Sequence, residues 1–353
     1  MAEPKPARGV STRPSPVATL VRAGVAIAVT AFALWVSFRD VALGALLDRL
    51  AGSDPGVLAL YAGAQLVIHA VRVWRWDLLV RPLGAASGRA VFSAASVGIP
   101  AAMFLPLRLG ELVRPAMIAR SGVPFPSAMA SVVTERIADG LANVGLFFVL
   151  LATMPASTAM PDEVALMAKI ALVGFGGACV VLVAMVVARG PALALTRRLL
   201  TPISEALAGR VVGLLEVFIQ GLAPLYQPSR LVGFLVSTAI YWALNGLTTT
   251  LLARSYGLDV PLVAGPFAVV IVVFAVTLPA GPAFAGVLQM GYRLGLAPFG
   301  VDANGAALVA ISAHLVQIAV QASIMGVGFL AAEPAQRRKG DAAAQVEDPE
   351  PGR

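Results

Sequence analysis

The sequence predicts an all-α fold: a polytopic membrane helix bundle of about eight transmembrane helices, with two broken or re-entrant segments and a candidate inverted repeat. Hydrophobic residues make up 58% of the 353-residue chain and charged residues only 13%, and the mean hydropathy is +0.84. Soluble domains carry about 25% charged residues. The apolar residues gather in long runs between basic loops and Pro- or Gly-rich breaks, which is typical of helices that cross a bilayer.

A hydrocarbon core about 30 Å thick requires roughly 20 apolar residues per crossing helix. Six runs meet this length, at residues 17–38, 55–73, 137–154, 164–188, 231–252 and 304–331. A seventh run, 262–278, is shorter but rich in β-branched residues. Two further segments, 91–107 and 283–297, are interrupted by Pro and Gly, and we expect half-helices or re-entrant hairpins there. The first run could also be a cleaved signal peptide, but the many later spans favour a retained helix.

Basic residues concentrate in alternate loops, and the positive-inside rule then fixes the orientation. The two tails and the loop at 189–230 are rich in arginine, whereas the segment at 155–163 is neutral to acidic. Both termini are therefore expected in the cytoplasm, in a multi-pass protein of the bacterial inner (plasma) membrane. The number of crossings must be even, and eight satisfies this if 283–297 crosses and 91–107 only enters the membrane.

Three regions are predicted along the chain: a disordered cytoplasmic N-tail at 1–16, a transmembrane domain at 17–331 and a disordered cytoplasmic C-tail at 332–353. Within the basic loop, apolar residues recur every three or four positions, so an amphipathic surface helix is expected at about 192–222. The net charge of +7 is scattered over loops and tails. This distribution favours anionic lipid headgroups as partners and argues against nucleic acid.

Two similar Pro- and Gly-rich segments indicate an internal repeat. Each contains P-x-x-x-G, which ends at Gly110 in the first segment and runs from Pro282 to Gly286 in the second. A polar side chain with a carbonyl group follows, Glu111 in the first segment and Gln289 in the second. Many transporters consist of two inverted halves whose binding site is formed by broken helices, so these segments are candidates for such a site.

Ionisable residues in or beside the apolar runs are the strongest functional signal. Each costs about 2.5 to 3.5 kcal/mol at the centre of a membrane helix, so each needs a partner, a water-filled cavity or a position at the interface. The densest group consists of Arg72, Arg75, Arg108, Glu111, Arg114, Glu135, Arg136 and Asp139. Glu135 and Asp139 share one helix face, and pairs between arginine and carboxylate are expected within and between the segments.

Three interpretations of this charged group compete. The arginines could reach toward lipid headgroups as anchors, with Glu135 and Asp139 neutralising them. Alternatively, guanidinium groups and free N–H groups at helix ends form a phosphate site at membrane depth, which we favour for the residues from Arg108 to Asp139. An enzyme that uses Glu111 and Glu135 as an acid–base pair is disfavoured, because neighbouring arginines hold both carboxylates ionised.

The remaining polar and aromatic side chains suggest neither a cofactor nor a metal. His69 and His314 have no second ligand at metal spacing, so packed or hydrogen-bonded roles are expected. Polar residues that share a helix face, and could line a cavity or join helices, are His314 with Gln317 and Gln321, and Asn245 with Thr249. Aromatic residues near span ends are expected to form an interfacial belt, at Trp35, Trp74, Trp76, Tyr241 and Trp242.

Four motifs, in order along nearly the whole chain, carry a family resemblance. They are V-R-V-W-R-W-D-L-L at 71–79, P-L-R-L-G-E-L-V-R-P at 106–115, S-V-V-T-E-R-I-A-D-G-L at 131–141 and T-L-P-A-G-P-A-F-A-G-V-L-Q at 277–289. With these motifs the chain resembles the lysylphosphatidylglycerol synthase transmembrane, or flippase-like, integral membrane proteins. The resemblance implies a multi-span bundle with re-entrant elements, similar to the flippase half of the bacterial multiple peptide resistance factor, which moves aminoacylated phosphatidylglycerol between leaflets.

The resemblance also implies roles for particular residues and pathways. Other relatives accompany hopanoid or polyprenyl-linked glycan pathways. The family's first charged segment corresponds to Arg108, Gly110, Glu111 and Arg114, and its E-R-x-x-D to Glu135, Arg136 and Asp139. Relatives commonly end the second segment with glutamate, where this chain has Gln289. Because only a short charged tail follows residue 331, in place of a soluble aminoacyl-transfer domain, we do not expect a stand-alone synthase.

We therefore expect a non-enzymatic translocase that moves a phospholipid or a lipid-linked anionic substrate between leaflets, without ATP hydrolysis or a cofactor. The expected substrate-binding residues are Arg72, Arg75, Arg108, Gly110, Glu111, Arg114, Glu135, Arg136, Asp139, Pro282, Gly286 and Gln289. The alternative is a non-catalytic membrane partner that scaffolds a glycosyltransferase or a lipid-modifying enzyme.

Overall fold

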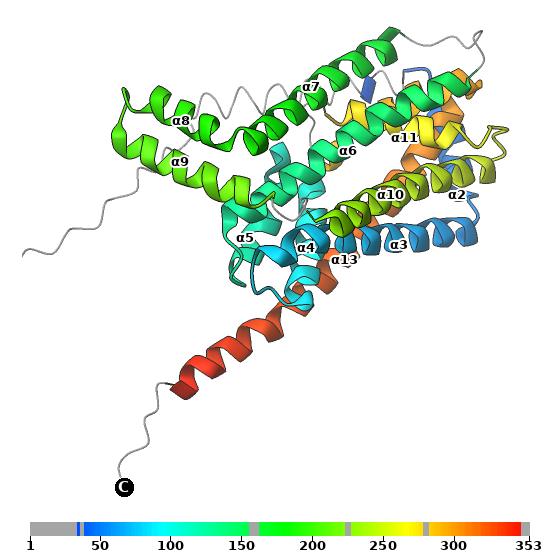
Figure 1. Cartoon of the computed structure of the whole chain (residues 1–353). Coiled ribbons are helices and arrows are strands. Elements are labelled where there is room, and N and C mark those ends of the chain that lie inside the picture. Colours follow the sequence, from blue (N-terminus) through cyan, green and yellow to red (C-terminus); the bar gives the residue numbers. More distant parts are fainter. Residues whose placement is uncertain (1–33, 36–38, 155–161, 223–226, 278–281, 347–353) are drawn as a thin grey trace, which may run out of the picture.

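The computed structural model of the chain describes residues 34–35, 39–154, 162–222, 227–277 and 282–346 (Figure 1). Throughout these residues the backbone forms helices and turns without a strand, which confirms the predicted all-α fold. The α-helices are α2 (Leu43–Ala51), α3 (Pro55–Val80), α4 (Gly88–Phe104), α5 (Val113–Ala119), α6 (Phe125–Thr153), α7 (Asp162–Val187), α8 (Arg189–Leu200), α9 (Glu205–Gln220), α10 (Pro228–Ser255), α11 (Ala264–Ala275), α12 (Val287–Leu296) and α13 (Ala303–Val346). Short 3₁₀ helices are η1 (Arg81–Leu83), η2 (Pro106–Leu112), η4 (Pro282–Phe284) and η5 (Ala297–Phe299).

Five of the described helices are long and apolar enough to cross a membrane: α3, α6, α7, α10 and α13. They confirm five of the six full-length spans predicted from the sequence. The sixth, at 17–38, lies almost entirely outside the described residues, as does the predicted N-tail at 1–16. The start of α3 is typical of a helix N-terminus, because Pro55 occupies the first turn and the Asp54 carboxylate accepts a hydrogen bond from the Gly56 N–H at 2.7 Å.

Two pairs of short helices form hairpins. In the first, η2 joins α4 to α5; in the second, η4 precedes α12, which packs against α11. With 12 and 10 residues, α11 and α12 are only about 18 and 15 Å long. The crossing expected at 262–278 is therefore wrong, as is the crossing at 283–297 that would have made the number eight, and these residues form one hairpin. Pro279 and Pro282 fall between the two helices in the sequence, and proline cannot continue a helix interior without losing a hydrogen bond. The half-helices expected at 91–107 and 283–297 agree with the short helices α4 and α12.

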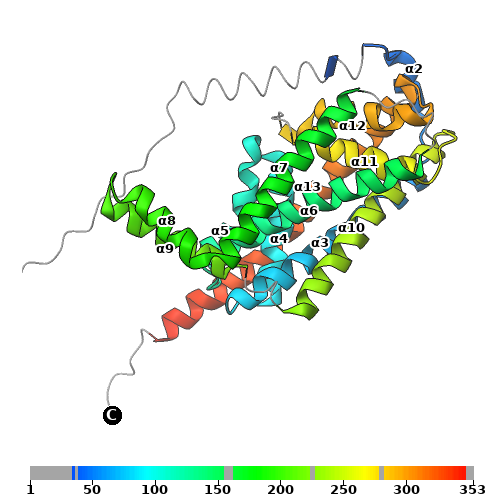
Figure 2. The same cartoon turned by 45° about the horizontal axis from the view of Figure 1, so that its top comes forward.

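The two hairpins occupy equivalent places in a repeated unit of long helix, hairpin and long helix. The first unit consists of α3, α4–α5 and α6, and the second of α10, α11–α12 and α13. Helices α3 and α10 lie side by side and run in opposite directions (Figures 1 and 2), which is the relation expected for an inverted repeat. Each hairpin contacts the last helix of the other unit, α4 on α13 and α11 on α6.

Glycine permits close approach within both hairpins. A Cβ atom at Gly110 would lie 2.0 Å from the carbonyl carbon of Ala101, and one at Gly291 would lie 2.6 Å from the Cα of Val272. Small residues at helix contacts are common in membrane proteins, because packing there is driven by close approach rather than by the hydrophobic effect. Gly110, proposed from the sequence as a site residue, therefore has a packing role in the first hairpin.

The loop at 189–230 contains two helices instead of the single surface helix predicted at about 192–222. Helices α8 and α9 pack against each other, and the turn between them contains Pro202. Ser204 starts α9, since its Oγ accepts a hydrogen bond from the Leu207 N–H at 3.3 Å. The proline and the new N-cap together explain why the helix is interrupted.

The last helix extends further than the sequence predicts. Helix α13 continues to Val346, into the segment 332–353 predicted to be a disordered tail, and this part projects from the bundle (Figure 1). The segment contains several alanines, which have the highest helix propensity.

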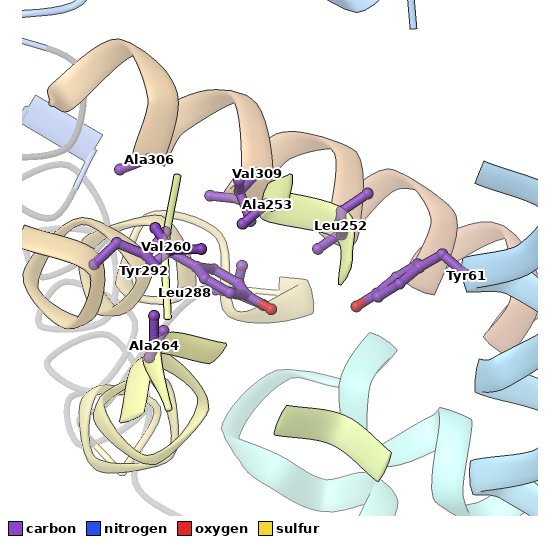
Figure 3. Close-up of a cluster of buried hydrophobic side chains, with 13 residues drawn as sticks. Tyr61, Leu252, Ala253, Val260, Ala264, Leu288, Tyr292, Ala306 and Val309 are labelled. Atoms are coloured by element: carbon purple, nitrogen blue, oxygen red, sulfur yellow. The ribbon is translucent and has the colours of Figure 1, made fainter. Parts of the chain in front are cut away.

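A buried cluster joins the start of α3 to the second unit (Figure 3). Tyr61 of α3 packs with Leu252 of α10, Leu288 and Tyr292 of α12, and Val309 of α13. The hydroxyl groups of Tyr61 and Tyr292 point toward each other (Figure 3). The two units therefore share one core at this end of the bundle.

Candidate functional site

A buried network of ion pairs joins α3, α5 and α6. The Arg75 guanidinium donates two hydrogen bonds to Asp139, from Nη1 to Oδ1 at 2.6 Å and from Nη2 to Oδ2 at 3.0 Å. Its Nη2 also donates to Glu135 Oε1 at 2.6 Å, and Arg114 Nη1 donates to Glu135 Oε2 at 2.8 Å. Arg75 and Glu135 are both 0% exposed. An unpaired charge at such a position would be strongly destabilising, so each member depends on the others.

The spacing of residues on each helix explains this network. Glu135 and Asp139 are four residues apart on α6, so their side chains stand on one face. Gly98 of α4 leaves room for Arg114, because a Cβ atom at Gly98 would lie 2.2 Å from Arg114 Cγ. The Arg114 guanidinium carbon also lies 5.2 Å from the centroid of the Trp76 ring, a favourable cation–π distance. The short helix α5 is thereby fixed to α3, α4 and α6.

The second unit contributes two aromatic side chains to the network. Trp242 Nε1 donates to Asp139 Oδ1 at 3.3 Å, and the Arg75 guanidinium carbon lies 4.9 Å from the centroid of the Tyr241 ring. Trp76 is fully buried and Trp242 is 9% exposed. The interfacial-belt role predicted for these two tryptophans is therefore wrong, since both side chains are enclosed by protein.

A cavity of about 470 Å³ adjoins the network and is lined by both units. This volume is in the range of small-molecule sites. Its charged lining residues are Arg72, Glu111, Arg136 and Asp139. Its neutral polar lining residues include Gln65, Asn245, Thr249, Gln317 and Gln321, and its aromatic ones include Tyr61, Phe175, Tyr241, Trp242, Phe284 and Tyr292. Of the polar faces noted in the sequence, Asn245 and Thr249 of α10 and Gln317 and Gln321 of α13 line this cavity, whereas His314 does not.

Two arginines in the cavity wall are incompletely paired. The Arg72 guanidinium carbon lies 5.6 Å from the Tyr241 ring centroid, and no carboxylate oxygen of the described residues is within 4.0 Å of its nitrogens. Arg136 is 3.9 Å from Glu135 and 4.0 Å from Glu111, beyond hydrogen-bond distance. The Nε atoms of Arg72 and Arg136 are buried, and neither has a hydrogen-bond partner in the described part of the chain.

The charges of the described cluster leave one positive charge in excess. Its four guanidiniums, on Arg72, Arg75, Arg114 and Arg136, face three carboxylates, on Glu111, Glu135 and Asp139. The two arginines and two carboxylates that line the cavity balance in charge, so the signal for an anion is the buried Nε donors of Arg72 and Arg136 together with the excess positive charge of the whole cluster. Such donors favour an anion with several acceptor oxygens, such as a phosphate group. The described residues contain no group of three or more His, Cys, Asp or Glu side chains arranged to hold a metal ion.

Comparison with known proteins assigns the chain to a family. The family described as "Lysylphosphatidylglycerol synthase TM region" matches residues 23–324. The chain belongs to this family. The resemblance seen in the four motifs is thereby confirmed, and the fold described above is that of a multi-pass membrane protein of the lysylphosphatidylglycerol synthase transmembrane family.

One curated relative carries an enzyme's name. Glycosyltransferase AglD of Haloferax volcanii is 27% identical over 341 residues, which cover 87% of this chain and 53% of AglD. The chain therefore spans about half the length of the curated relative it matches. No solved structure matches the chain.

The structure brings most of the first-unit residues proposed for the family site into one cluster. These residues are Arg72, Arg75, Glu111, Arg114, Glu135, Arg136 and Asp139. Only some of them reach the cavity, since Arg75, Arg114 and Glu135 do not line it. The side chain of Arg108 lies outside the described part of the structure.

Of the residues proposed from the second motif, Gly286 and Gln289 do not line the cavity. The Gln289 Oε1 accepts a hydrogen bond from the Gly286 N–H at 2.8 Å, and its Nε2 donates to His314 Nδ1 at 2.9 Å. This leaves the proton of His314 on Nε2, which donates to the Ala283 carbonyl at 2.8 Å. Gln289 and His314 therefore hold the turn before α12. The side chain of Pro282 is outside the described residues, while Phe284 does reach the cavity.

Several cavity residues were not predicted from the sequence. Gln65 lies seven residues before Arg72 on α3, two helical turns away on the same face, and this spacing could have indicated it. Tyr61 and Tyr292 carry no such signal, because an isolated tyrosine in an apolar helix is usually a packing residue. Their place in the cavity follows from how α3 and α12 meet (Figure 3).

Proposed function

We propose that the protein translocates a phospholipid or a lipid-linked anionic substrate between membrane leaflets, without ATP hydrolysis, and that the cavity holds the substrate's phosphate. The observation that carries the proposal is Arg72, which lines the cavity with a buried Nε that lacks a partner among the described residues. A phosphate oxygen supplies both the acceptor and the negative charge that this guanidinium lacks.

The members of the cluster divide into two roles in this proposal. Arg72 and Arg136 contact the phosphate, and Glu111 orients Arg136 from 4.0 Å. The family resemblance places Arg114 in the charged segment. In the structure its Nη1 donates a hydrogen bond to Glu135 at 2.8 Å, and Arg114 does not line the cavity. Together with Arg75 it supports the wall, and substrate binding does not depend on breaking this buried network.

The inverted arrangement of the two units provides a way to open the cavity first to one side of the membrane and then to the other. Transporters built from inverted repeats expose a fixed midplane site to either side by moving one unit against the other. Here each hairpin packs against the last helix of the opposite unit, so a shift between the units changes both contacts together. The expected placement is the bacterial inner membrane, with both termini in the cytoplasm.

Reconstitution tests this proposal. The purified chain is placed in liposomes that contain a fluorescent phosphodiester lipid, and a membrane-impermeant quencher measures how fast the lipid changes leaflet, without nucleotide. We expect exchange well above the rate of empty vesicles. If folded protein leaves the exchange at the empty-vesicle rate for phosphodiester lipids of several headgroups, the proposal is overturned.

A second candidate function rests on the match to AglD, which is named a glycosyltransferase and of which this chain spans about half. In this alternative the protein is a membrane partner that scaffolds a glycosyltransferase or a lipid-modifying enzyme. It predicts co-purification with such an enzyme, together with full function of an Arg72→Ala variant. The translocase proposal predicts loss of function in the same variant.

A further inference from the structure

A second cavity, of about 560 Å³, lies between α3, α4 and α13. Most of its lining residues are apolar, and each of the three helices contributes one that is exposed on the outside of the bundle, namely Leu66, Phe92 and Val327. Helices α3 and α13 are long and apolar enough to cross a membrane, and exposed apolar patches of this kind mark contact with lipid. We call this cavity the membrane-facing groove.

The groove extends over about half of a membrane span. Its lining residues run from Leu66 in α3 to Arg81 in η1, a distance of about 22 Å along the helix axis. The span itself runs from Pro55 to Leu83, and His69, near the inner end of the groove, is fourteen residues from either end. At the outer end Arg81 Nε lies 2.8 Å from Asp77 Oδ1. A groove that leads from the end of a span to its middle has the extent of a lipid in one leaflet.

The groove and the cavity beside Arg72 adjoin each other. Helices α3, α4 and α13 each line both spaces, with a groove residue and a cavity residue only three positions apart. The three pairs are His69 and Arg72 on α3, Ser96 and Ile99 on α4, and Ile324 and Gln321 on α13, the groove residue named first in each. Three positions are less than one helical turn, about 4.5 Å along the axis. The two spaces are therefore separated by a thin layer of side chains at the level of Arg72.

This layer contains polar groups at the middle of the span. His69 Nε2 and Ser96 Oγ are 3.1 Å apart, within hydrogen-bond distance, and join α3 to α4. His69 is only 6% exposed, and its Nδ1 has no hydrogen-bond partner among the described residues. The same is true of Gln321 Oε1 on the cavity side. Buried polar atoms without partners are destabilising, and here they offer hydrogen bonds to a polar headgroup that passes between the two spaces.

A lipid held by its phosphate at Arg72 needs apolar surroundings for its acyl chains. The charged side chains of Arg72, Glu111 and Arg136 in the cavity wall are unfavourable neighbours for hydrocarbon, whose burial is stabilised by apolar contact. The groove provides such contact one helical turn away and is open to the membrane on its outer side. An acyl chain in the groove therefore stays in apolar surroundings while the phosphate enters the cavity.

We infer that the membrane-facing groove is the lateral entrance of the cavity and holds one acyl chain of the lipid whose phosphate binds Arg72. His69 and Ser96 form the gate between the two spaces, and their hydrogen bond closes it in this structure. The inference rests on the proposed function and adds to it the site for the apolar part of the substrate. The ligand it implies is a membrane lipid that enters sideways from one leaflet.

A photoreactive lipid tests which surface the chain occupies. The full chain is reconstituted with phosphatidylglycerol that carries a diazirine in one acyl chain, and mass spectrometry identifies the residues labelled on illumination. We expect Phe92 and Val327 to be labelled several-fold more than Leu235 of α10, which is also exposed but lies outside the groove. Equal labelling of the three residues would indicate ordinary contact with bulk lipid and would overturn the inference.

Filling the groove tests whether lipid enters through it. Ala70 lines the groove, and Ala70→Trp should slow leaflet exchange of the same lipid about tenfold, a rise of about 1.4 kcal/mol in the barrier. Val67→Trp is the matched control and should exchange at the wild-type rate, since Val67 is 55% exposed on α3 and does not line the groove. If the wild type exchanges lipid and the two variants exchange it equally fast, this inference alone is contradicted. If the wild type does not exceed the empty-vesicle rate, the proposed function is contradicted and the inference with it.

A reversible cross-link tests the gate. The chain's one cysteine is removed by Cys179→Ser, and His69→Cys and Ser96→Cys are joined by a short bifunctional thiol reagent that forms disulfides, with the cross-link verified by mass. We expect lipid exchange to stop in the cross-linked protein and to return to the rate of the uncross-linked double variant after reduction. This recovery also shows that the protein is folded. Unchanged exchange by fully cross-linked protein would overturn the gate.

Discussion

The two inverted units have the same order of elements but different interiors. In the first, the helices that flank the hairpin carry Arg75, Glu135 and Asp139, which form a buried ionic network with Arg114 of the hairpin. In the second, the turn of the hairpin is held by neutral hydrogen bonds, from Gln289. The comparison teaches that the architecture alone does not require charge, because a hairpin of the same kind is also stabilised without it.

The charged interior carries a cost that the neutral one does not. Burying ions requires large desolvation energies, which pairing only partly offsets. In the proposed function this network supports the cavity wall beside Arg72, since Arg72 and Asp139 both line the cavity. The following predictions test whether the two units differ in stability as their chemistry implies.

The largest expected difference is between Glu135→Gln and Gln289→Leu. The first substitution leaves the buried guanidiniums of Arg75 and Arg114 without their shared carboxylate charge, which should cost about 3 to 5 kcal/mol. The second removes neutral hydrogen bonds to Gly286 and His314 and should cost about 1 to 3 kcal/mol. Thermal unfolding in detergent measures both. Equal losses of unfolding free energy in the two variants would show that the ionic network stabilises the fold no more than the neutral hydrogen bonds do.

Glycine substitutions should affect the two hairpins alike. Gly110→Ala and Gly291→Ala each place a methyl group against the facing backbone, and overpacking of this kind costs about 1 to 3 kcal/mol. Gly145→Ala on α6 is the matched control, because a Cβ atom there meets nothing within 4 Å and alanine favours the helix by about 0.5 to 1 kcal/mol. Loss of stability in the control, or none in the hairpins, would refute the close packing.

The smallest effect is expected from the exposed ion pair between Asp40 and Arg293 of α12. The hydrogen bond from Arg293 holds the pKa of the Asp40 carboxyl below its ordinary value of 3.8. The stability that a lowered pKa contributes is fully present above the pKa of the unfolded chain. It is lost as the pH falls through the pKa of the folded protein, which here lies below 3.8. Asp40→Asn should therefore remove a small pH dependence between about pH 5 and 3.

Salt distinguishes this exposed pair from the buried network. We compare the thermal unfolding midpoints of the wild type and Asp40→Asn as the pH is lowered. At low ionic strength the two midpoints should differ slightly. The difference should disappear in 1 M salt, where the screening length is about 3 Å. A difference between the two proteins that persists in high salt would contradict an exposed contact.

The sequence predicted the helices that depend on local pattern and missed those that depend on packing. Apolar length identifies α3, α6, α7, α10 and α13, since a bilayer imposes that length. The same criterion failed at 262–278, because a β-branched run of that length does not reveal that α11 ends after twelve residues. Packing on α12, α10 and α6 stabilises the short helix.

The candidate site was predicted to a similar extent. Charge density identified the first-unit cluster, because buried arginines and carboxylates need partners. It could not assign their roles, so Arg114 was expected to contact a phosphate and is instead bonded to Glu135. The contribution of Tyr241 and Trp242 also escaped prediction, since only the contact between α10 and the first unit brings them to Arg75 and Asp139.

Leaflet exchange by Arg72→Gln tests the central claim most directly. Arg72 lines the cavity without a paired carboxylate among the described residues, so its loss removes a contact to the phosphate and leaves the buried network intact. We predict exchange of a phosphodiester lipid about ten- to a hundredfold slower than in the wild type, the equivalent of one charged hydrogen bond. Arg198→Gln, on the surface helix α8, should exchange the lipid at the wild-type rate. Wild-type exchange by a folded Arg72→Gln protein would contradict the account.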